Sequence, residues 1–319
     1  AYLIARDRVA DPLPVEAASQ LDGPLDADLA AIRDQYVEIK LNGARYTPWQ
    51  DGIVAAKRGG SDERWATARD AIAREQTPGG DPTLLYNIGA NAKAALEEMG
   101  YTNLSALLGT DPAEIRLEDC SGIGGKRAQQ IRAVLRANRT GVPVRLPAEK
   151  VPPRRAVEFF VDFEYFTNVN VDFERQWPSL EGHEMVFMIG AGREAEGEWE
   201  FCTFVADAEE PASELRMFEA FRGYLHAQTD GAVFNASETA LYHWSGAEVW
   251  QTRRVAERQQ LAEGHVLRRL PWCDLQKVFL DGPAALPGAL DFRLKSVADA
   301  LGRIDPRFGV QWPVALDQG

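Results

Sequence analysis

The sequence is poor in cysteine, with only Cys120, Cys202 and Cys273 in 319 residues. The three are widely spaced and form no CxxC pair, which excludes a disulfide framework and a zinc site built from cysteine pairs. We therefore expect them to act as small buried hydrophobes in a reducing compartment.

Long apolar runs are also absent. No stretch approaches the roughly 18 unbroken apolar residues of a membrane-spanning helix, and the opening residues "AYLIARDRVADPLP" carry charges where a signal peptide is apolar. We expect a soluble, cytoplasmic, globular protein, since 45% of the residues are hydrophobic and 26% charged. The chain begins without Met and ends at "VALDQG", so we also expect a fragment truncated at both ends.

Positive charge is scarce overall. The net charge of −13 argues against a protein that simply coats nucleic acid. Basic residues nevertheless gather in residues 126–155, where Glu149 is the single acid. This basic segment predicts either a footprint for an anionic polymer or a solvated helix face followed by a linker. Its members are Lys126, Arg127, Arg132, Arg136, Arg139, Arg145, Lys150, Arg154 and Arg155.

A glycine-rich turn, "SGIGGKRAQQI", opens the basic segment. In a helix-hairpin-helix unit, glycines such as Gly122, Gly124 and Gly125 let backbone N–H groups approach a phosphate, and the following helix dipole adds a favourable field. Lys126 and Arg127 would then stand beside that phosphate. The same turn can also serve only to pack two helices. We predict sequence-independent contact with nucleic acid, with DNA preferred over RNA.

Composition and periodicity divide the chain into four segments. We expect a helical or irregular region over 1–80, a helix-hairpin-helix-like region over 81–141, a proline-rich linker over 142–155 and an α/β domain with a mixed sheet over 156–319. The "VEIK" fragment at 37–40 has the Glu-x-Lys spacing of many metal-dependent nucleases. It lacks a partner acid, so we interpret it as an ordinary pair on a helix.

Two acids interrupt the apolar stretch "EFFVDFEYF". Strand alternation places Asp162 and Glu164 on one face, about 6 to 7 Å apart. Such carboxylates repel each other unless they are protonated or bridged by a cation, and oxygen-rich sites suit Mg²⁺ or Mn²⁺. An edge strand facing solvent is the alternative. The neighbouring positions are nearly all apolar, which indicates a central strand covered on both faces and favours a metal site.

The same stretch supports a resemblance to a known family. "FVDFEYF" is similar to the first motif, Asp-x-Glu, of the DEDD exonuclease superfamily, which has a ribonuclease-H-like fold. With "MVFMIGAG", "EWEFCTF" and "LYHWSGAE", it resembles the YprB-like domain of predicted RecB-family nucleases over most of residues 155–304. The resemblance implies a ribonuclease-H-like mixed sheet with flanking helices, preceded by a mostly helical region. It also implies 3′-5′ exonuclease activity with two Mg²⁺ or Mn²⁺ ions and an upstream RecB-like module, whose metal motifs are not visible here.

The resemblance extends the catalytic and metal-binding set, Asp162 and Glu164, to Glu248. A glutamate in the first turn of a helix is also ordinary helix-dipole chemistry. His243 is expected either to hydrogen-bond a carboxylate or phosphate or to be structural, and Asp274 to cap a helix or to orient the ligands. Lys295 would contact substrate phosphate or remain solvated.

The superfamily needs a fourth acid on a later helix. After Gly302 the candidates are Asp305 and Asp317. Both lie in segments that contain Pro, Gly or Trp and do not look helical. We expect the missing helix to lie beyond Gly319. The alternative to an exonuclease is therefore a non-catalytic nucleic-acid-binding module with an incomplete nuclease domain.

Overall fold

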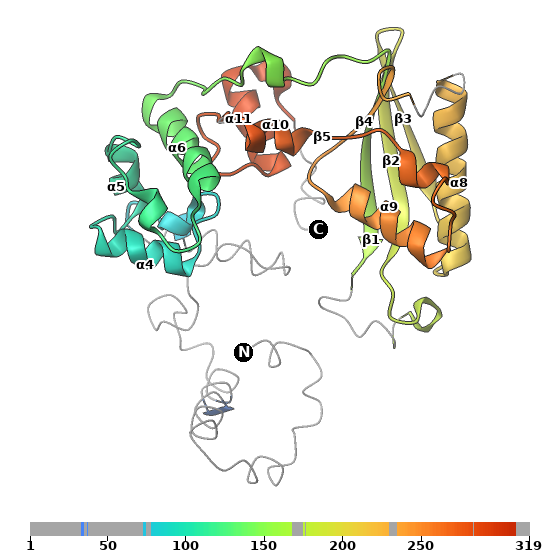
Figure 1. Ribbon diagram of the computed structural model, residues 1–319, viewed down its shortest axis with the longest axis horizontal. Helices are drawn as coiled ribbons and strands as arrows, with labels where there is room; N and C mark the ends of the chain where they lie inside the picture. Colours follow the sequence, from blue (N-terminus) through green and yellow to red (C-terminus); the bar gives the residue numbers. More distant parts are fainter. Residues whose placement is uncertain are drawn as a thin grey trace.

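The computed structural model describes residues 33–34, 37, 73–74, 78–167, 175, 177–229, 235–282 and 284–310 (Figure 1). Most of the predicted 1–80 region, the Glu-x-Lys pair at Glu38 and Lys40, and Asp317 lie outside these residues. Within the described part of the chain, no helix combines the length and the apolar character that crossing a bilayer requires.

A five-stranded mixed sheet is the centre of the fold and confirms the predicted α/β class. Its order is β3-β2-β1-β4-β5, with β1–β2 and β2–β3 antiparallel and β1–β4 and β4–β5 parallel. Glu196 and Gly197, both with positive φ, form the two-residue turn that joins β2 to β3. The strands are β1 (Val157–Phe166), β2 (Met185–Ala195), β3 (Glu198–Val205), β4 (Thr239–His243) and β5 (Trp272–Asp274).

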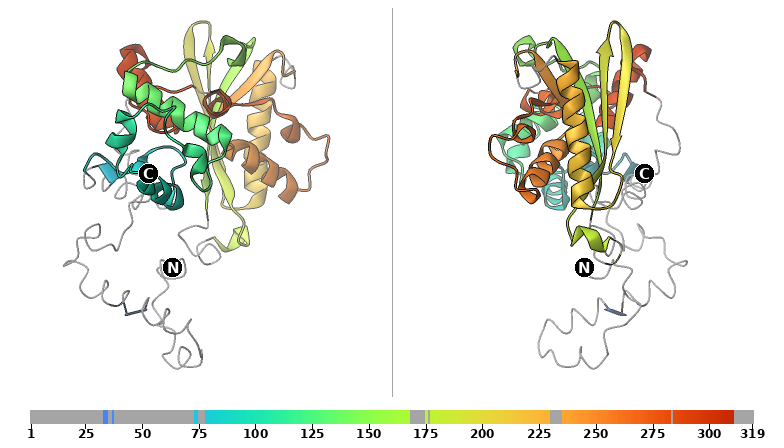
Figure 2. Two further views of the ribbon diagram at one scale, coloured as in Figure 1. Left: turned by 60° about the vertical axis from the view of Figure 1, so that its left-hand side comes forward. Right: turned by 90° about the vertical axis from the view of Figure 1, so that its right-hand side faces the viewer.

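Helices α8 (Pro211–Gln228) and α9 (Ala247–Arg258) pack on the sheet face that carries Phe159, Val161 and Phe163 (Figure 2). The core there also contains Phe218, Phe221, Leu241 and Val255. Burial alternates from Phe159 to Glu164 of β1, which is the pattern of a half-buried strand.

The opposite face of β1 is exposed from Phe160 to Glu164. Phe160 keeps 40% of its surface accessible, and Asp162 and Glu164 are exposed with it. The prediction that both faces of this strand are covered is therefore wrong, although β1 is central in the sheet. The physical reason is that α8 and α9 cover the odd-numbered residues, and the even-numbered ones point away from them.

The region before the sheet is built from short helices that share one core with the helices after it (Figure 1). Ala285 and Phe292 belong to the same core as Leu107, Ile131 and Leu135. A bridge between Val144 and Ala285 ties the predicted linker to this core. The α-helices are α4 (Ala90–Glu98), α5 (Leu104–Gly109), α6 (Gly125–Thr140), α10 (Leu275–Asp281) and α11 (Leu294–Ile304). The 3₁₀ turns are Pro82–Leu84, Leu117–Asp119, Ala148–Lys150, Pro178–Leu180, Val266–Arg269 and Pro306–Phe308.

Candidate functional site

The two strand acids lie side by side on the open face of β1. Asp162 is in register with Gly190 of β2 and Glu164 with Met188, and the strand register shifts directly after Glu164. Gly190 has a steric reason to lack a side chain, because a Cβ there would stand 3.0 Å from the Phe201 ring. The open face therefore presents two carboxylates beside an aromatic side chain of β3.

Glu248 lies in the first turn of α9, which follows β4, the parallel neighbour of β1. It is the second residue of the helix, is only 4% exposed, and its Oε2 lies 3.1 Å from Nδ1 of His243. His243 is itself buried, 5% exposed, at the end of β4. The turn between strand and helix thus places an imidazole and a carboxylate in direct contact, which fixes the orientation of the Glu248 side chain.

Asp274 holds that turn in place. Its Oδ1 accepts hydrogen bonds from the backbone N–H of Gln276, at 2.9 Å, and from that of Ser245, at 3.1 Å. The first bond makes Asp274 the N-cap of α10, which confirms the predicted capping role. The second bond secures Ser245, whose φ of 78° lies in the left-handed region just before α9. Asp274 therefore holds the backbone that leads into α9, the helix that carries Glu248.

The predicted ligands influence one another electrostatically. The pKa of Asp162 is raised, first because surrounding protein removes water from this carboxylate, and then because of the nearby negative charges of Glu248 and Glu164. A hydrogen bond from the Phe163 N–H partly opposes the rise. Although Asp162 is counted among the exposed residues of β1, part of its water shell is replaced by protein and by other acids.

The three carboxylates do not form a ready-made metal cage. Among the described residues, no group of three or more His, Cys, Asp or Glu side chains is spaced to hold a metal ion. The donor chemistry nevertheless suits a hard divalent cation, because a cation would relieve the repulsion that raises the pKa of Asp162. Coordination would require new rotamers, which the exposed Asp162 and Glu164 side chains can adopt.

Sequence reasoning missed the acid Glu184 and the phenol of Tyr165. The pKa of Tyr165 is raised by burial first and then by Glu184, Glu248 and Glu164. Glu184 is held by α9, where Arg254 Nη1 lies 2.6 Å and Gln251 Nε2 3.3 Å from its Oε2. The i, i+3 spacing of Glu248 and Gln251 on one helix was the signal that could have indicated a polar face.

The glycine-rich turn places two glycines without close neighbours at the start of α6. Gly122 has φ +84°, which requires glycine, whereas Gly124 and Gly125 meet no neighbouring atom where a Cβ would be. Packing therefore does not explain these last two glycines. They begin the 16-residue helix α6, which has no side-chain cap and no acid in its first turn.

The predicted cations of this turn already have partners. Lys126 Nζ lies 2.6 Å from Asp281 Oδ1, and both side chains are exposed. Arg127 Nη1 donates to the Gly122 carbonyl at 2.8 Å. An exposed ion pair contributes little stability, so a phosphate can compete for Lys126 at small cost.

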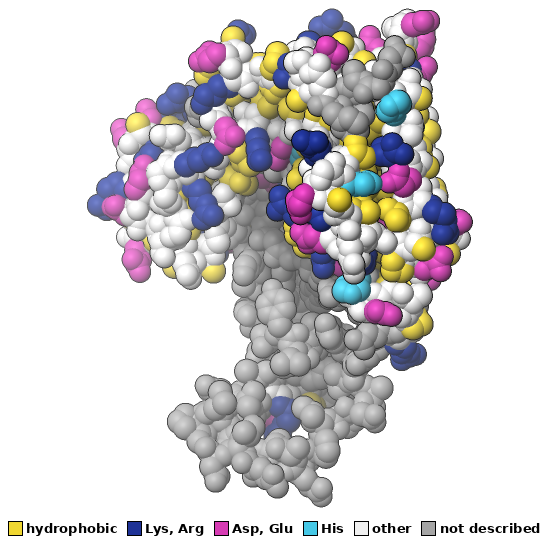
Figure 3. All heavy atoms as spheres, turned by 45° about the vertical axis from the view of Figure 1, so that its right-hand side comes forward, with side chains coloured by type: hydrophobic (Ala, Val, Ile, Leu, Met, Phe, Trp, Pro, Cys, Tyr) yellow, Lys and Arg dark blue, Asp and Glu magenta, His cyan; other side chains and the backbone are white. Residues whose placement is uncertain are grey.

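Acids from elsewhere in the chain neutralise much of the basic segment. Arg132, Arg139 and Arg154 pair with Glu118, Asp111 and Glu158 at 2.5, 3.6 and 2.9 Å. Arg132 lowers the pKa of Glu118 to about 2 through a side-chain hydrogen bond. Figure 3 shows basic and acidic side chains interspersed on the visible face. The single-sign run in the sequence therefore does not become a single-sign surface there.

The remaining predicted residues lie apart from Asp162 in the fold. Lys295 is an exposed residue in the first turn of α11. Asp305 follows α11, caps a 3₁₀ turn and pairs with Arg307 at 2.6 Å, which lowers its pKa. It lies outside a helix, as predicted, and its carboxylate is engaged locally.

Comparisons with protein-family models, with curated proteins and with solved structures find no match to this chain. The functional assignment therefore depends on the chemistry of the site.

Mn²⁺ is expected to stabilise the wild-type protein and to have no effect on an Asp162→Asn variant. Ions that bind only the folded state raise its stability by about 2.7 kcal/mol at a hundredfold excess over Kd. Without metal, the variant should unfold about 1–2 °C higher than the wild type, because it lacks a carboxylate placed among other acids. Differential scanning calorimetry with and without Mn²⁺ measures both effects.

The pH dependence has a definite sign. Because the folded-state pKa of Asp162 is raised, its contribution to stability is present below the unfolded pKa and is lost as pH rises through the folded value. Asp162→Asn should remove the part of the fall in stability with rising pH that this carboxylate causes. A metal-induced rise in Tm of equal size in both proteins would contradict a role for Asp162 in binding.

Proposed function

We propose that this protein is a metal-dependent nuclease that hydrolyses phosphodiester bonds of DNA, or of RNA, and digests from the 3′ end. The observation that carries the proposal is the placement of Asp162 and Glu164 on one exposed face of the central strand, within reach of the charge of Glu248. Asp162 and Glu164 come from the central strand, and the charge of Glu248 is near enough to raise the pKa of Asp162. The order β3-β2-β1-β4-β5, with β2 antiparallel to its neighbours, supports a ribonuclease-H-like sheet.

Each residue has a role that its surroundings suggest. Asp162, Glu164 and Glu248 would hold two Mg²⁺ or Mn²⁺ ions, which activate water and stabilise the leaving oxygen when bound. His243 keeps the Glu248 carboxylate in one orientation through the 3.1 Å contact. Asp274 keeps the backbone before α9 in its left-handed turn.

The helix-hairpin-helix-like turn would hold the nucleic acid. Gly122, Gly124 and Gly125 leave the start of α6 open to a phosphate, and Lys126 and Arg127 add charge. Lys295 is a further candidate for a phosphate contact. Backbone contacts of this kind carry no sequence information, so cleavage should be independent of sequence.

The direct test is nucleotide release from single-stranded DNA by the purified protein. Label at the 3′ end should appear in mononucleotides before label at the 5′ end, with Mn²⁺ or Mg²⁺ and not with excess chelator. DNA blocked by a 3′ phosphorothioate linkage is the matched control for polarity. Equal release with and without metal would end the assignment.

A second function, binding without catalysis, is favoured by one observation. The described residues contain no group already spaced to hold a metal ion. A nucleic-acid-binding module would bind DNA in chelator as tightly as in Mn²⁺ and release no nucleotides.

Substituting Lys126 and Arg127 together by glutamine is expected to weaken DNA binding and its dependence on salt. Each lost phosphate contact should reduce the slope of log K against log salt by about 0.7–0.9. Fluorescence anisotropy over a salt series in chelator measures this slope. The double variant Arg222→Gln and Arg253→Gln removes the same charge from α8 and α9 and should keep the wild-type slope. An unchanged slope for the Lys126 and Arg127 variant would exclude the turn from the interface.

A further inference from the structure

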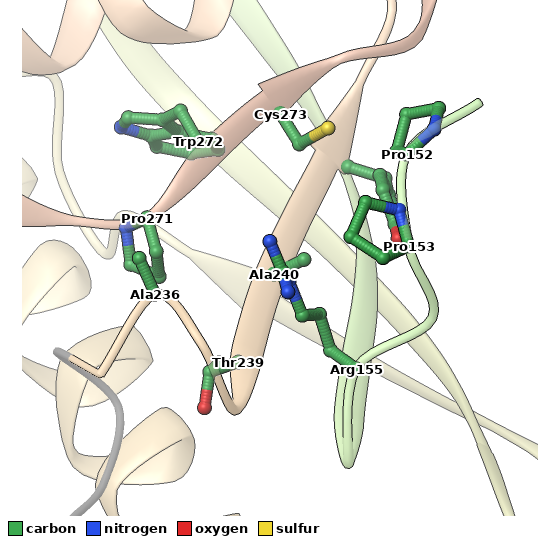
Figure 4. Close-up of a pocket in the computed structure, with 10 residues that line it drawn as sticks. Pro152, Pro153, Arg155, Ala236, Thr239, Ala240, Pro271, Trp272 and Cys273 are labelled. Carbon is green, nitrogen blue, oxygen red and sulfur yellow. The ribbon is translucent and has the colours of Figure 1, made fainter. Parts of the chain in front are cut away.

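A small pocket lies between the end of the predicted linker and the neighbouring strands β4 and β5 (Figure 4). It has a volume of about 160 Å³ and is formed by the linker, the first part of β4 and the strand β5. None of the candidate metal ligands lines it. The lining residues that matter here are Pro152, Pro153, Arg155, Tyr242, Trp272 and Cys273.

Among the described residues that line the pocket, Arg155 is the one with a cationic side chain. Arg155 is half-buried, and Figure 4 shows its side chain reaching from the linker toward Ala240 of β4. No hydrogen bond or ion pair of its guanidinium is found among the described residues, although its backbone N–H donates to Glu158 at 2.9 Å. The donors of a half-buried guanidinium without an acidic partner remain available to water or to an anion that enters the pocket.

Glu158 cannot serve as a partner of the Arg155 guanidinium without losing contacts of its own. Glu158 accepts from the Arg155 N–H and from the hydroxyl of Tyr242, both at 2.9 Å, and pairs with Arg154 Nε at 2.9 Å. Its side chain is only 8% exposed. Glu158 is therefore held by three partners, while its charge still reaches the pocket. Burial and then Glu158 raise the pKa of Tyr242 to about 12, and Arg155 opposes that rise. Burial raises the pKa of Cys273, Arg155 opposes the rise, and Asp274 and Glu158 add to it.

The walls and the volume restrict what can enter. Two prolines, Tyr242 and Trp272 offer apolar surface, so the body of a ligand should be apolar. An engineered cavity of about 150 Å³ in another protein holds one benzene molecule, so a pocket of this size admits about one ring and excludes a nucleotide.

We propose that this pocket binds a compact organic anion, a carboxylate or phosphate on an apolar body of about one ring, through Arg155. The site is separate from the proposed nuclease centre, so the two proposals stand or fall independently. The guanidinium would form charge-assisted hydrogen bonds to the anion, while the ring packs between the prolines and Trp272.

Cys273 offers a direct measurement, because its thiol lines the pocket. We expect benzoate or phenyl phosphate to slow the alkylation of Cys273 by iodoacetamide. Mass spectrometry of the wild-type protein measures the rate of this alkylation. Neutral benzamide should not protect Cys273. Cys202 on β3, also partly exposed, should react at an unchanged rate and serves as the internal control. Comparing benzoate with phenyl phosphate identifies the anion that the pocket prefers.

Arg155→Gln should raise the concentration needed for half-protection by about tenfold or more, the effect of losing hydrogen bonds to a charged group. Arg155→Lys should retain part of the protection, and Arg145→Gln, which removes an exposed charge of the same segment, should retain all of it. Unchanged thermal unfolding of each variant establishes that it is folded. Absence of protection in the wild type, equal protection by benzamide, or full protection in Arg155→Gln would each overturn the proposal.

Discussion

Replacing Asp162 by asparagine is expected to reduce metal-dependent degradation of single-stranded DNA by about a hundredfold or more. Residues that only orient metal ligands typically contribute about 10–100-fold to affinity or activity, and a ligand contributes at least as much. Asp162 occupies the middle of the central strand, and Glu248 and Glu164 both act on its pKa. Asparagine keeps the shape of the side chain and removes the charge that attracts a cation.

The matched control is Glu198→Gln, which removes an exposed carboxylate from β3 in the same sheet. It should retain wild-type nucleotide release. Asp162→Asn should also abolish the Mn²⁺-induced rise in Tm, which separates lost metal binding from a damaged fold. Wild-type activity in Asp162→Asn would exclude the nuclease centre, whatever the effect on DNA binding.

Local patterns in the sequence predicted the elements that carry the candidate site. Alternation in "VEFFVDFEYF" gave the common face of Asp162 and Glu164, and the acid after "HWSGA" lies in the first turn of α9. These predictions succeed because strand alternation and helix starts depend on residues only a few positions apart. The N-cap at Asp274 belongs to the same class.

Long-range contacts explain what the sequence did not reveal. The basic segment contains one acid, yet Glu118, Asp111 and Asp281 reach it from other parts of the chain. Similarly, nothing in the pattern of β1 indicates that both covering helices pack on one side and leave Phe160 exposed. Which face of a strand is covered depends on tertiary packing, which local periodicity does not specify.

The contact between Glu184 and α9 is of the same kind. Its partners Gln251 and Arg254 are 67 and 70 residues away in the sequence. Motif spacing cannot reveal contacts over such a separation, although these contacts hold a further acid, Glu184, near Tyr165. The composition of the site beyond its first three acids could therefore be obtained only from the structure.

Replacing Arg258 by methionine is expected to destabilise the fold by about 3–5 kcal/mol, because removal of one partner leaves a buried charge uncompensated. Glu214 on α8 is completely buried, accepts from the Val186 N–H of β2 at 2.8 Å and pairs with Arg258 of α9. This carboxylate therefore connects both covering helices to the sheet. For a chain of this size the loss corresponds to a fall in Tm of about 10 °C, which chemical and thermal unfolding would measure.

The pH dependence and a double variant identify the cause of that loss. Burial raises the pKa of Glu214, and Arg258 acts to lower it, so Arg258→Met should raise it further. A raised folded-state pKa means stability that is present below the unfolded pKa and lost as pH rises through the folded one. The deficit of Arg258→Met should therefore shrink at acid pH.

Adding Glu214→Gln, which removes the charge and keeps an acceptor for Val186, should restore most of the stability at neutral pH. If the double variant is no more stable than Arg258→Met alone, lost packing of the arginine stem, rather than an uncompensated carboxylate, is the reason for the instability.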